Sequence, residues 1–235
     1  NNQSNTNSNF AGVPPQYREI LQERQIKEQK RLQIMEEARN ALMRPGMRFT
    51  ALTPLSQLDL DKALGILSDG KTTQSCKSAA IINAYACIVP EGISGAQLLN
   101  VLINGNSYFE KDGSPKNLQG LSNALARELN LSQTLIIDNT KVTPSILWDL
   151  TVGAIVTLKR VDAYNKSYTH YVFKNYVYGI IDSMWPGRPS ASQYTESQYE
   201  ILNWSEPTPC TAPIPCSEPT HRSEPNNSFE FFLNR

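Results

Sequence analysis

Over the first two thirds of the chain, apolar residues recur three and four positions apart, and short polar runs separate the apolar segments. This spacing is typical of amphipathic helices that pack around one core. The pattern predicts helices over 55–67, 76–88, 94–103, 117–129 and 144–150, with one brief strand over 134–138. Helices therefore dominate the first part of the expected globular domain.

After Gly153 the apolar pattern changes from helical spacing to alternation. Three segments rich in β-branched and aromatic side chains follow, and this pattern predicts strands over 154–161, 168–174 and 177–182. Helices followed by antiparallel strands is the order of an α+β protein. We expect the helix over 76–88 to pack as a central element on this C-terminal antiparallel sheet.

The last two predicted strands should form a hairpin, and its register decides which side chains share a face. A three-residue loop at 174–176 would pair Phe173 with Val177. Strand alternation would then place His170 and Asp182 on the same face of the sheet, close enough to interact. A two-residue loop would instead place Asp182 on the opposite face.

Polar segments flank the globular domain that we predict over 46–204. Residues 1–13 are rich in Asn and Ser and should be disordered, and residues 205–235 form a Pro-rich tail of low complexity. Residues 14–45 predict a long charged helix, which Pro45-Gly46 ends. We expect both ends to be dispensable for folding.

The long helix has two interpretations. Its apolar positions over 16–43 are sparse and its charges are mixed. This pattern favours a solvated helix that docks only by its C-terminal part. The alternative is an arm that binds a partner protein or a coiled coil.

Composition and charge narrow the class of protein. The 235 residues carry 22 basic and 22 acidic side chains, so we expect no nucleic-acid binding through bulk positive charge. No apolar run approaches the roughly 20 residues of a membrane helix, so we expect no membrane span. Cys210, Cys216 and His221 in the tail are too loosely spaced to predict a zinc site, and we expect neither metal nor cofactor.

Cys76 is the strongest candidate for chemistry. It follows a polar, turn-forming run and begins the helix over 76–88, where the helix dipole favours a thiolate. His170 is the only histidine of the globular domain, and Asp182 lies on the next strand. A Cys-helix followed by a His-strand and an acid-strand is the order that a Cys-His-Asp triad of papain-like type requires. Cys87, within the same helix, reads as a small core residue.

Each candidate has a defined role in this reading. Cys76 would attack a carbonyl carbon, His170 would accept the thiol proton, and Asp182 would orient the imidazole. The alternative role for Asp182 is to cap the turn that follows it. The Cys76 backbone N–H and the Gln74 side-chain amide are the candidates for holding the oxyanion.

These residues resemble the papain-like cysteine peptidase superfamily. Residues 74–85 resemble the nucleophile helix of the double-glycine bacteriocin-processing peptidases, its compact bacterial branch. Residues 147–157 resemble the helix, glycine and apolar strand that precede the family's histidine, and 169–173 and 178–186 resemble its histidine and aspartate strands. The chain departs from the family at Lys77, where glycine is frequent, and the family's oxyanion glutamine usually lies further upstream than Gln74.

The resemblance implies a thiol-dependent amide hydrolase that acts on a protein substrate, at a peptide bond or at a glutamine side chain. Injected bacterial effectors of this fold include proteases and glutamine deamidases, so it also implies a soluble protein, either secreted into a host cell or cytoplasmic. Transglutaminase-like acyl transfer and a non-enzymatic adaptor of the same fold are the alternatives. Aromatic residues around His170 favour a narrow slot for one side-chain amide, namely Tyr164, Tyr168, Tyr178 and Trp185.

Overall fold

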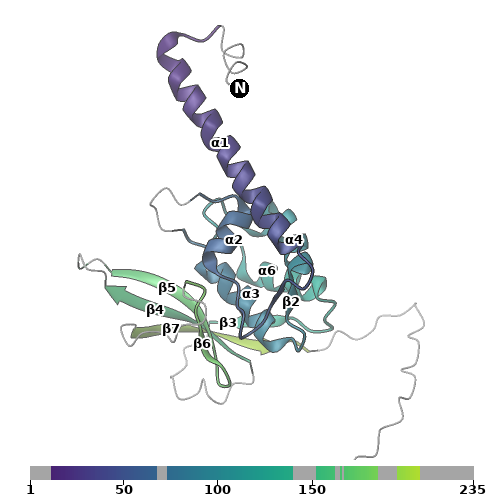
Figure 1. The fold of residues 1–235 in the computed structure, drawn as a ribbon. Helices are drawn as coiled ribbons and strands as arrows, with labels where there is room; N and C mark the ends of the chain where they lie inside the picture. Colours follow the sequence, from purple (N-terminus) through teal and green to yellow (C-terminus); the bar gives the residue numbers. More distant parts are fainter. Residues whose placement is uncertain are drawn as a thin grey trace, which may run out of the picture.

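The computed structural model describes residues 12–67, 73–139, 152–161, 165, 167–184 and 195–206. Within them the chain combines helices with antiparallel sheets, as an α+β protein does (Figure 1). The helices are α1 (Pro15–Leu42), α2 (Gln57–Leu64), α3 (Cys76–Ile88), α4 (Gly95–Ile103), α5 (Gly105–Tyr108) and α6 (Leu118–Glu128). The strands are β1 (Arg48–Phe49), β2 (Ile93–Ser94), β3 (Leu135–Asp138), β4 (Gly153–Val161), β5 (Ser167–Asn175), β6 (Gly179–Ile181) and β7 (Thr195–Trp204).

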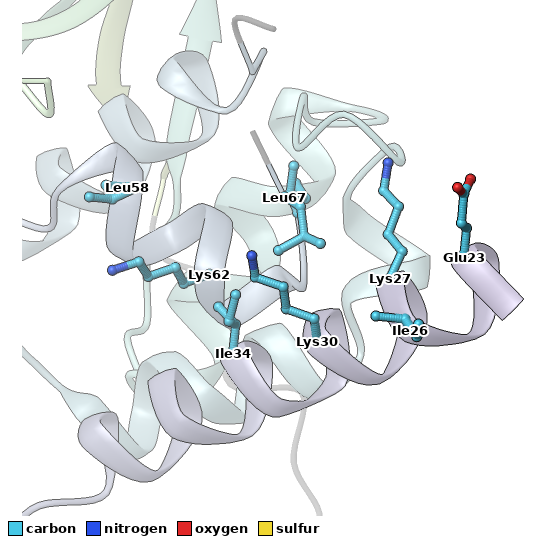
Figure 2. Close-up of a pocket in the computed structure, with 9 residues that line it drawn as sticks. Glu23, Ile26, Lys27, Lys30, Ile34, Leu58, Lys62 and Leu67 are labelled. Carbon is cyan, nitrogen blue, oxygen red and sulfur yellow. The ribbon is translucent and has the colours of Figure 1, made fainter. Parts of the chain in front are cut away.

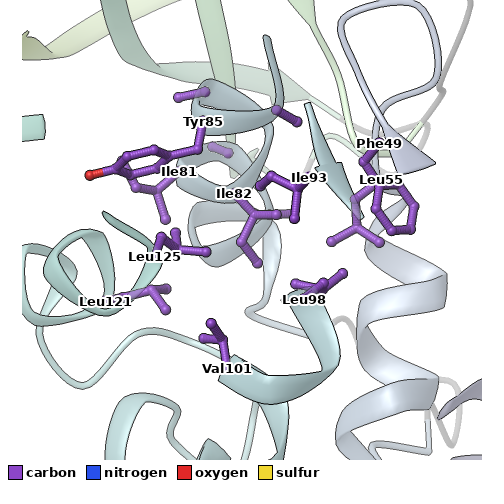
Figure 3. Close-up of a cluster of buried hydrophobic side chains, with 14 of the residues drawn as sticks. Phe49, Leu55, Ile81, Ile82, Tyr85, Ile93, Leu98, Val101, Leu121 and Leu125 are labelled. Carbon is purple, nitrogen blue, oxygen red and sulfur yellow. The ribbon is translucent and has the colours of Figure 1, made fainter. Parts of the chain in front are cut away.

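Helix α3 is the central element of the core. Nearly all its side chains are buried, because α6, α2 and strands β4 and β5 surround it (Figure 3). Its buried polar groups are satisfied, since Asn83 exchanges two hydrogen bonds with the backbone of Leu55 and Ser78 donates to the Gly113 carbonyl. A helix this deeply buried holds its first residue, Cys76, in a fixed place.

Tyr85 connects α3 to α6 and β3. Its hydroxyl lies 2.8 Å from the Ser122 hydroxyl and 3.2 Å from that of Thr134, and it accepts a 2.9 Å hydrogen bond from the Leu135 amide. The ring also meets that of Trp204 edge-on, with centroids 6.3 Å apart. One buried hydroxyl therefore joins three elements of the core.

The large sheet has the strand order β3-β7-β4-β5-β6, and every pairing is antiparallel. Strand β7 follows all the others in sequence, yet it lies between β3 and β4. Alternation separates the sheet's side chains into two clusters. Paired Ile155 and Phe173 join the core around α3, whereas paired Val156 and Val172 belong to the second cluster.

Helix α1 docks only by its C-terminal part, and its N-terminal part extends away from the body (Figure 1). Leu42 is buried in the core, and Arg39 donates a 3.0 Å hydrogen bond to the Ala63 carbonyl of α2. The backbone of α4 approaches closely here, because a Cβ added at Gly95 would lie 1.9 Å from the Leu42 carbonyl oxygen. The last turn of α1 is thus part of the packed domain.

The hairpin register differs from the prediction. The loop has three residues, as expected, but it lies at 176–178, and Phe173 pairs with Ile181 in place of Val177. The reason is local, since the Asn175 side chain accepts hydrogen bonds from the amides of Val177 and Tyr178 and Gly179 adopts a left-handed φ of 70°. Because the partner shifts by an even number of residues, His170 and Asp182 still share a face.

Other predicted elements agree in type and differ at their ends. The helix expected over 55–67 is shorter as α2, because Gly65 ends it in a left-handed conformation. Strand β7 was not predicted. The helix expected over 144–150 and the tail after residue 206 lie outside the described residues, as does the N-terminal segment up to residue 11.

Candidate active site

Cys76 occupies the first position of α3, directly after the N-cap residue Ser75. The backbone N–H groups of a helix's first turn have no acceptor within the helix, so they point toward the space in front of it. Cys76 is buried and unbridged, and it lines a cavity of about 420 Å³. The predicted helix start is therefore confirmed, and Cys76 contributes to the lining of this cavity.

His170 and Asp182 meet beside the same cavity. The Nε2 atom of His170 lies 2.6 Å from Oδ1 of Asp182, and both side chains are buried. The same carboxylate oxygen accepts a 2.9 Å hydrogen bond from the Met184 amide, so Asp182 also caps the turn that follows it. Asp182 therefore makes the contact that each of its two predicted roles requires, and the cap holds the carboxylate in position for the imidazole.

Burial alone would lower the pKa of His170. Hydrogen bonds and charge interactions with Asp182 and with the Cys76 thiol oppose it and raise the pKa to about 9. Because Nε2 is taken by Asp182, Nδ1 is the ring nitrogen left to face the sulfur. The sequence-predicted Cys, His and Asp thus converge, and the imidazole is protonated at neutral pH.

Helix α2 supplies a wall of the cavity that sequence reasoning missed. Gln57 donates a 2.9 Å hydrogen bond to the Thr73 hydroxyl, which donates in turn to Asp61 at 2.6 Å. Burial raises the pKa of Asp61, while the hydroxyls of Ser75 and Thr73 oppose that rise. These contacts fasten the segment before Cys76 to α2. The available signal was an acidic residue, Asp61, on the buried side of the predicted helix.

The two ends of the site are tied together through the same helix. The amide of Gln57 donates a 2.9 Å hydrogen bond to the carbonyl of Ser183, which directly follows the acid of the predicted triad. Helix α2 therefore contacts both the segment before Cys76 and the segment that follows β6 and contains Asp182. Its position fixes the width of the cavity between them.

Gln74 also lines the cavity, but its side chain is exposed. Its backbone amide donates a 3.0 Å hydrogen bond to the Asp112 carbonyl, which anchors the segment. Among the residues that the structure describes, its side-chain amide has no hydrogen-bond partner. It is thus free to turn toward a substrate, and its oxyanion role stays a prediction.

Lys77, the residue after Cys76, connects helix α3 to the sheet. Its ammonium group lies 2.5 Å from a carboxylate oxygen of Glu200 on β7 and 4.9 Å from the centre of the Tyr171 ring on β5. Lys77 therefore holds α3 against two strands of the sheet.

Of the aromatic residues expected to form a slot, Tyr168 lines the cavity. Tyr178 lies in the exposed hairpin loop, and Tyr164 and Trp185 are outside the described residues. Leu58 and Met184 add apolar surface to the lining. The described cavity is thus mixed in polarity.

Cys87 gives an internal contrast to Cys76. Burial raises its pKa to about 11, and it packs against the hydrophobic core. Among the described residues, no cluster of three or more His, Cys, Asp or Glu side chains is placed to hold a metal ion, and no helix has the length and apolar character needed to cross a membrane.

Comparison with known proteins returns no matching family model, no matching curated protein and no matching solved structure. The chemistry of this site therefore has to be argued from its own geometry.

Proposed function

We propose that this protein is a thiol-dependent amide hydrolase of papain-like fold that acts on a protein substrate. The observation that carries the proposal is the meeting of a helix-borne thiol with a buried His170–Asp182 pair at one cavity. Such a meeting is rare by chance, because burying an imidazole and a carboxylate costs free energy unless they are paired. Paired groups beside a cysteine supply what covalent acyl transfer needs.

The reaction would run through a thioester. With its proton on His170, the Cys76 sulfur attacks the carbonyl carbon of an amide. The resulting oxyanion is held by the Cys76 backbone N–H, with Gln74 as the candidate second donor. His170 then protonates the departing amine, and afterwards it accepts a proton from the water that hydrolyses the thioester.

Either a peptide bond or a glutamine side chain fits this chemistry, since both are amides that pass through the same acyl-enzyme. Tyr168, Leu58 and Met184 in the cavity lining provide apolar contacts for the part of the substrate next to the amide. The family resemblance supports a bacterial effector as the setting.

Thiol reactivity tests the proposal. We expect Cys76 to react with iodoacetamide at pH 6 at least about tenfold faster than Cys87, which serves as the control within the same helix. Mass spectrometry of tryptic peptides separates the cysteines, and His170→Ala should remove the difference. If Cys76 labels no faster than a cysteine in an unfolded chain, the proposed hydrolase activity is refuted.

Intact mass then separates the two amide reactions. Incubation of candidate protein substrates with wild type and with Cys76→Ala should give, for a deamidase, a gain of about 1 Da without cleavage. Discrete fragments that require Cys76 would establish a protease.

A further inference from the structure

A second concavity lies outside the cavity of Cys76, between the middle of α1 and helix α2 (Figure 2). It has a volume of about 450 Å³. Lys27 and Lys30 of α1 and Lys62 of α2 line it, and Glu23 is the acidic residue among its lining. Its apolar lining consists of Ile26, Ile34, Leu58, Ile66 and Leu67. We call this feature the α1–α2 groove.

The charges of the groove are not balanced from within. Three lysines against one glutamate leave a net charge of +2 on its lining. Neither Lys30 nor Lys62 forms an ion pair with any residue in the described part of the chain. Elsewhere on α1 such compensation exists, since Arg31 pairs with Glu28 at 2.6 Å. Within the described residues, the groove thus presents two lysines without an ion pair, Lys30 from α1 and Lys62 from α2 (Figure 2).

The apolar lining is also open to solvent. Ile26 is 65% exposed and Leu58 is 56% exposed, although both lie in a concave surface. Apolar side chains flanked by lysines form a surface that complements an acidic segment with apolar residues between its charges. A basic segment would meet like charge there.

Leu58 connects the groove to the candidate active site, because it lines both the groove and the cavity of Cys76. On one side of it Gln57 faces the cavity, and on the other Lys62 faces the groove. The groove and the cavity are therefore neighbours that share Leu58 in their linings.

We propose that the α1–α2 groove binds an acidic, apolar segment of the protein substrate and so delivers the adjoining residues to Cys76. The identification of that segment as substrate rests on the proposed function, whereas the binding itself does not involve Cys76. The groove would determine which protein substrate binds, while the cavity would bind only the amide that reacts.

Binding is tested first, with a fluorescein-labelled peptide of about ten Glu, Asp and Leu residues and the full-length chain. Fluorescence anisotropy should show binding that weakens with added salt, and a peptide with Lys in place of the acids should not bind. The variant Lys30→Glu/Lys62→Glu should bind about tenfold more weakly. Arg44→Glu/Lys159→Glu is the matched control, since it makes the same charge change at exposed positions outside the groove and should bind as wild type.

Equal weakening in both double variants would overturn the proposal, because bulk charge would then explain the binding. Full affinity in Lys30→Glu/Lys62→Glu would also overturn it. A gain in affinity when residues 207–235 are deleted would also overturn it, since the occupant of the groove would then be the chain's own Pro-rich tail.

The link to Cys76 is tested with the same acidic peptide joined by a Gly-Ser linker of about ten residues to a vinyl sulfone. The thiolate adds to the vinyl carbon, and the proton of His170 ends on the neighbouring carbon. We expect this probe to label Cys76 about tenfold faster than the linker and warhead alone, and Lys30→Glu/Lys62→Glu to abolish the advantage. If neither probe labels Cys76 while the peptide still binds, the result would count against the proposed function but not against peptide binding at the α1–α2 groove. Equal labelling rates in wild type would refute delivery.

Discussion

Replacing Asp182 by asparagine removes one charge from the site and keeps its shape. The asparagine Oδ1 can still accept the hydrogen bonds that reach Asp182 from the Met184 amide and from His170. What disappears is the negative charge beside the imidazole. The substitution therefore isolates electrostatics from packing, and Glu128→Gln, at an exposed carboxylate of α6, is the matched control.

The size of the effect follows from the pKa of His170. The difference between an ordinary histidine at 6.5 and about 9 corresponds to about 3 kcal/mol in favour of the imidazolium. Burial lowers this pKa, so without the Asp182 charge we expect the pKa of His170 to fall well below 9. Alkylation of Cys76 between pH 7 and 9 should then slow by about one to two orders of magnitude.

Stability should change with pH in the same sense. A histidine whose folded pKa is raised stabilises the protein fully below the unfolded pKa of about 6.5, and this contribution is lost as pH rises through about 9. Wild type should therefore lose up to about 3 kcal/mol between pH 6 and 9.5, whereas Asp182→Asn should lose little.

Proton NMR measures the pKa directly, because the chain has only two histidines and His221→Gln leaves the signal of His170 alone. Urea denaturation at the two pH values measures the stability change. A His170 pKa that stays near 9 in Asp182→Asn would falsify the assignment of Asp182 as the charge that orients and protonates the imidazole.

Three further predictions concern the core. Tyr85→Phe leaves the Leu135 amide without its buried acceptor and should lower the free energy of unfolding by about 1–3 kcal/mol in urea titrations, with no change in the m-value. Gly95→Ala forces a Cβ against the Leu42 backbone carbonyl and should destabilise the fold by about 3 kcal/mol. Gly120→Ala is the control, because a Cβ there has no neighbour nearer than 3.6 Å and should be neutral or stabilising. Equal melting temperatures for the two variants would contradict the close packing of α1 and α4. A chain that starts at Ile34 should unfold cooperatively with near-native stability, but one that starts at Arg48 loses the buried last turn of α1 and should lose about 2–4 kcal/mol, against the expectation from sequence that residues 1–45 are dispensable.

Much of the fold could be predicted because local signals were strong. Helix α3 has the predicted bounds, since its apolar run begins directly after a polar turn and ends before Pro90. The pairing of His170 with Asp182 was predicted from alternation, which survives a register shift of even length. The shift itself went unseen because residues 176–178 are aromatic and β-branched and resemble a strand, although the Asn175 side chain turns them into a loop.

Strand β7 was missed for a different reason. Its sequence is rich in polar residues, and their partners come from elsewhere in the chain. Glu196 pairs with Lys174 of β5, and Glu200 pairs with Lys77 of α3. No local pattern can show that a charged residue will be half-buried by an ion pair from another element. The same holds for Gln57, whose place beside Cys76 depends on how α2 packs.

The position of β7 has a consequence for how the chain folds. Its two neighbours, β3 and β4, precede it in sequence, yet neither pairs directly with the other. The sheet therefore cannot form completely until residues 195–204 have been synthesised and have paired with β3 and β4. This pairing is a non-local step, which slows folding. Until then both neighbours expose open backbone edges, so a nascent or partly unfolded chain is most prone to aggregate there. A peptide of residues 195–204 supplied in trans is accordingly the natural tool for capturing this intermediate.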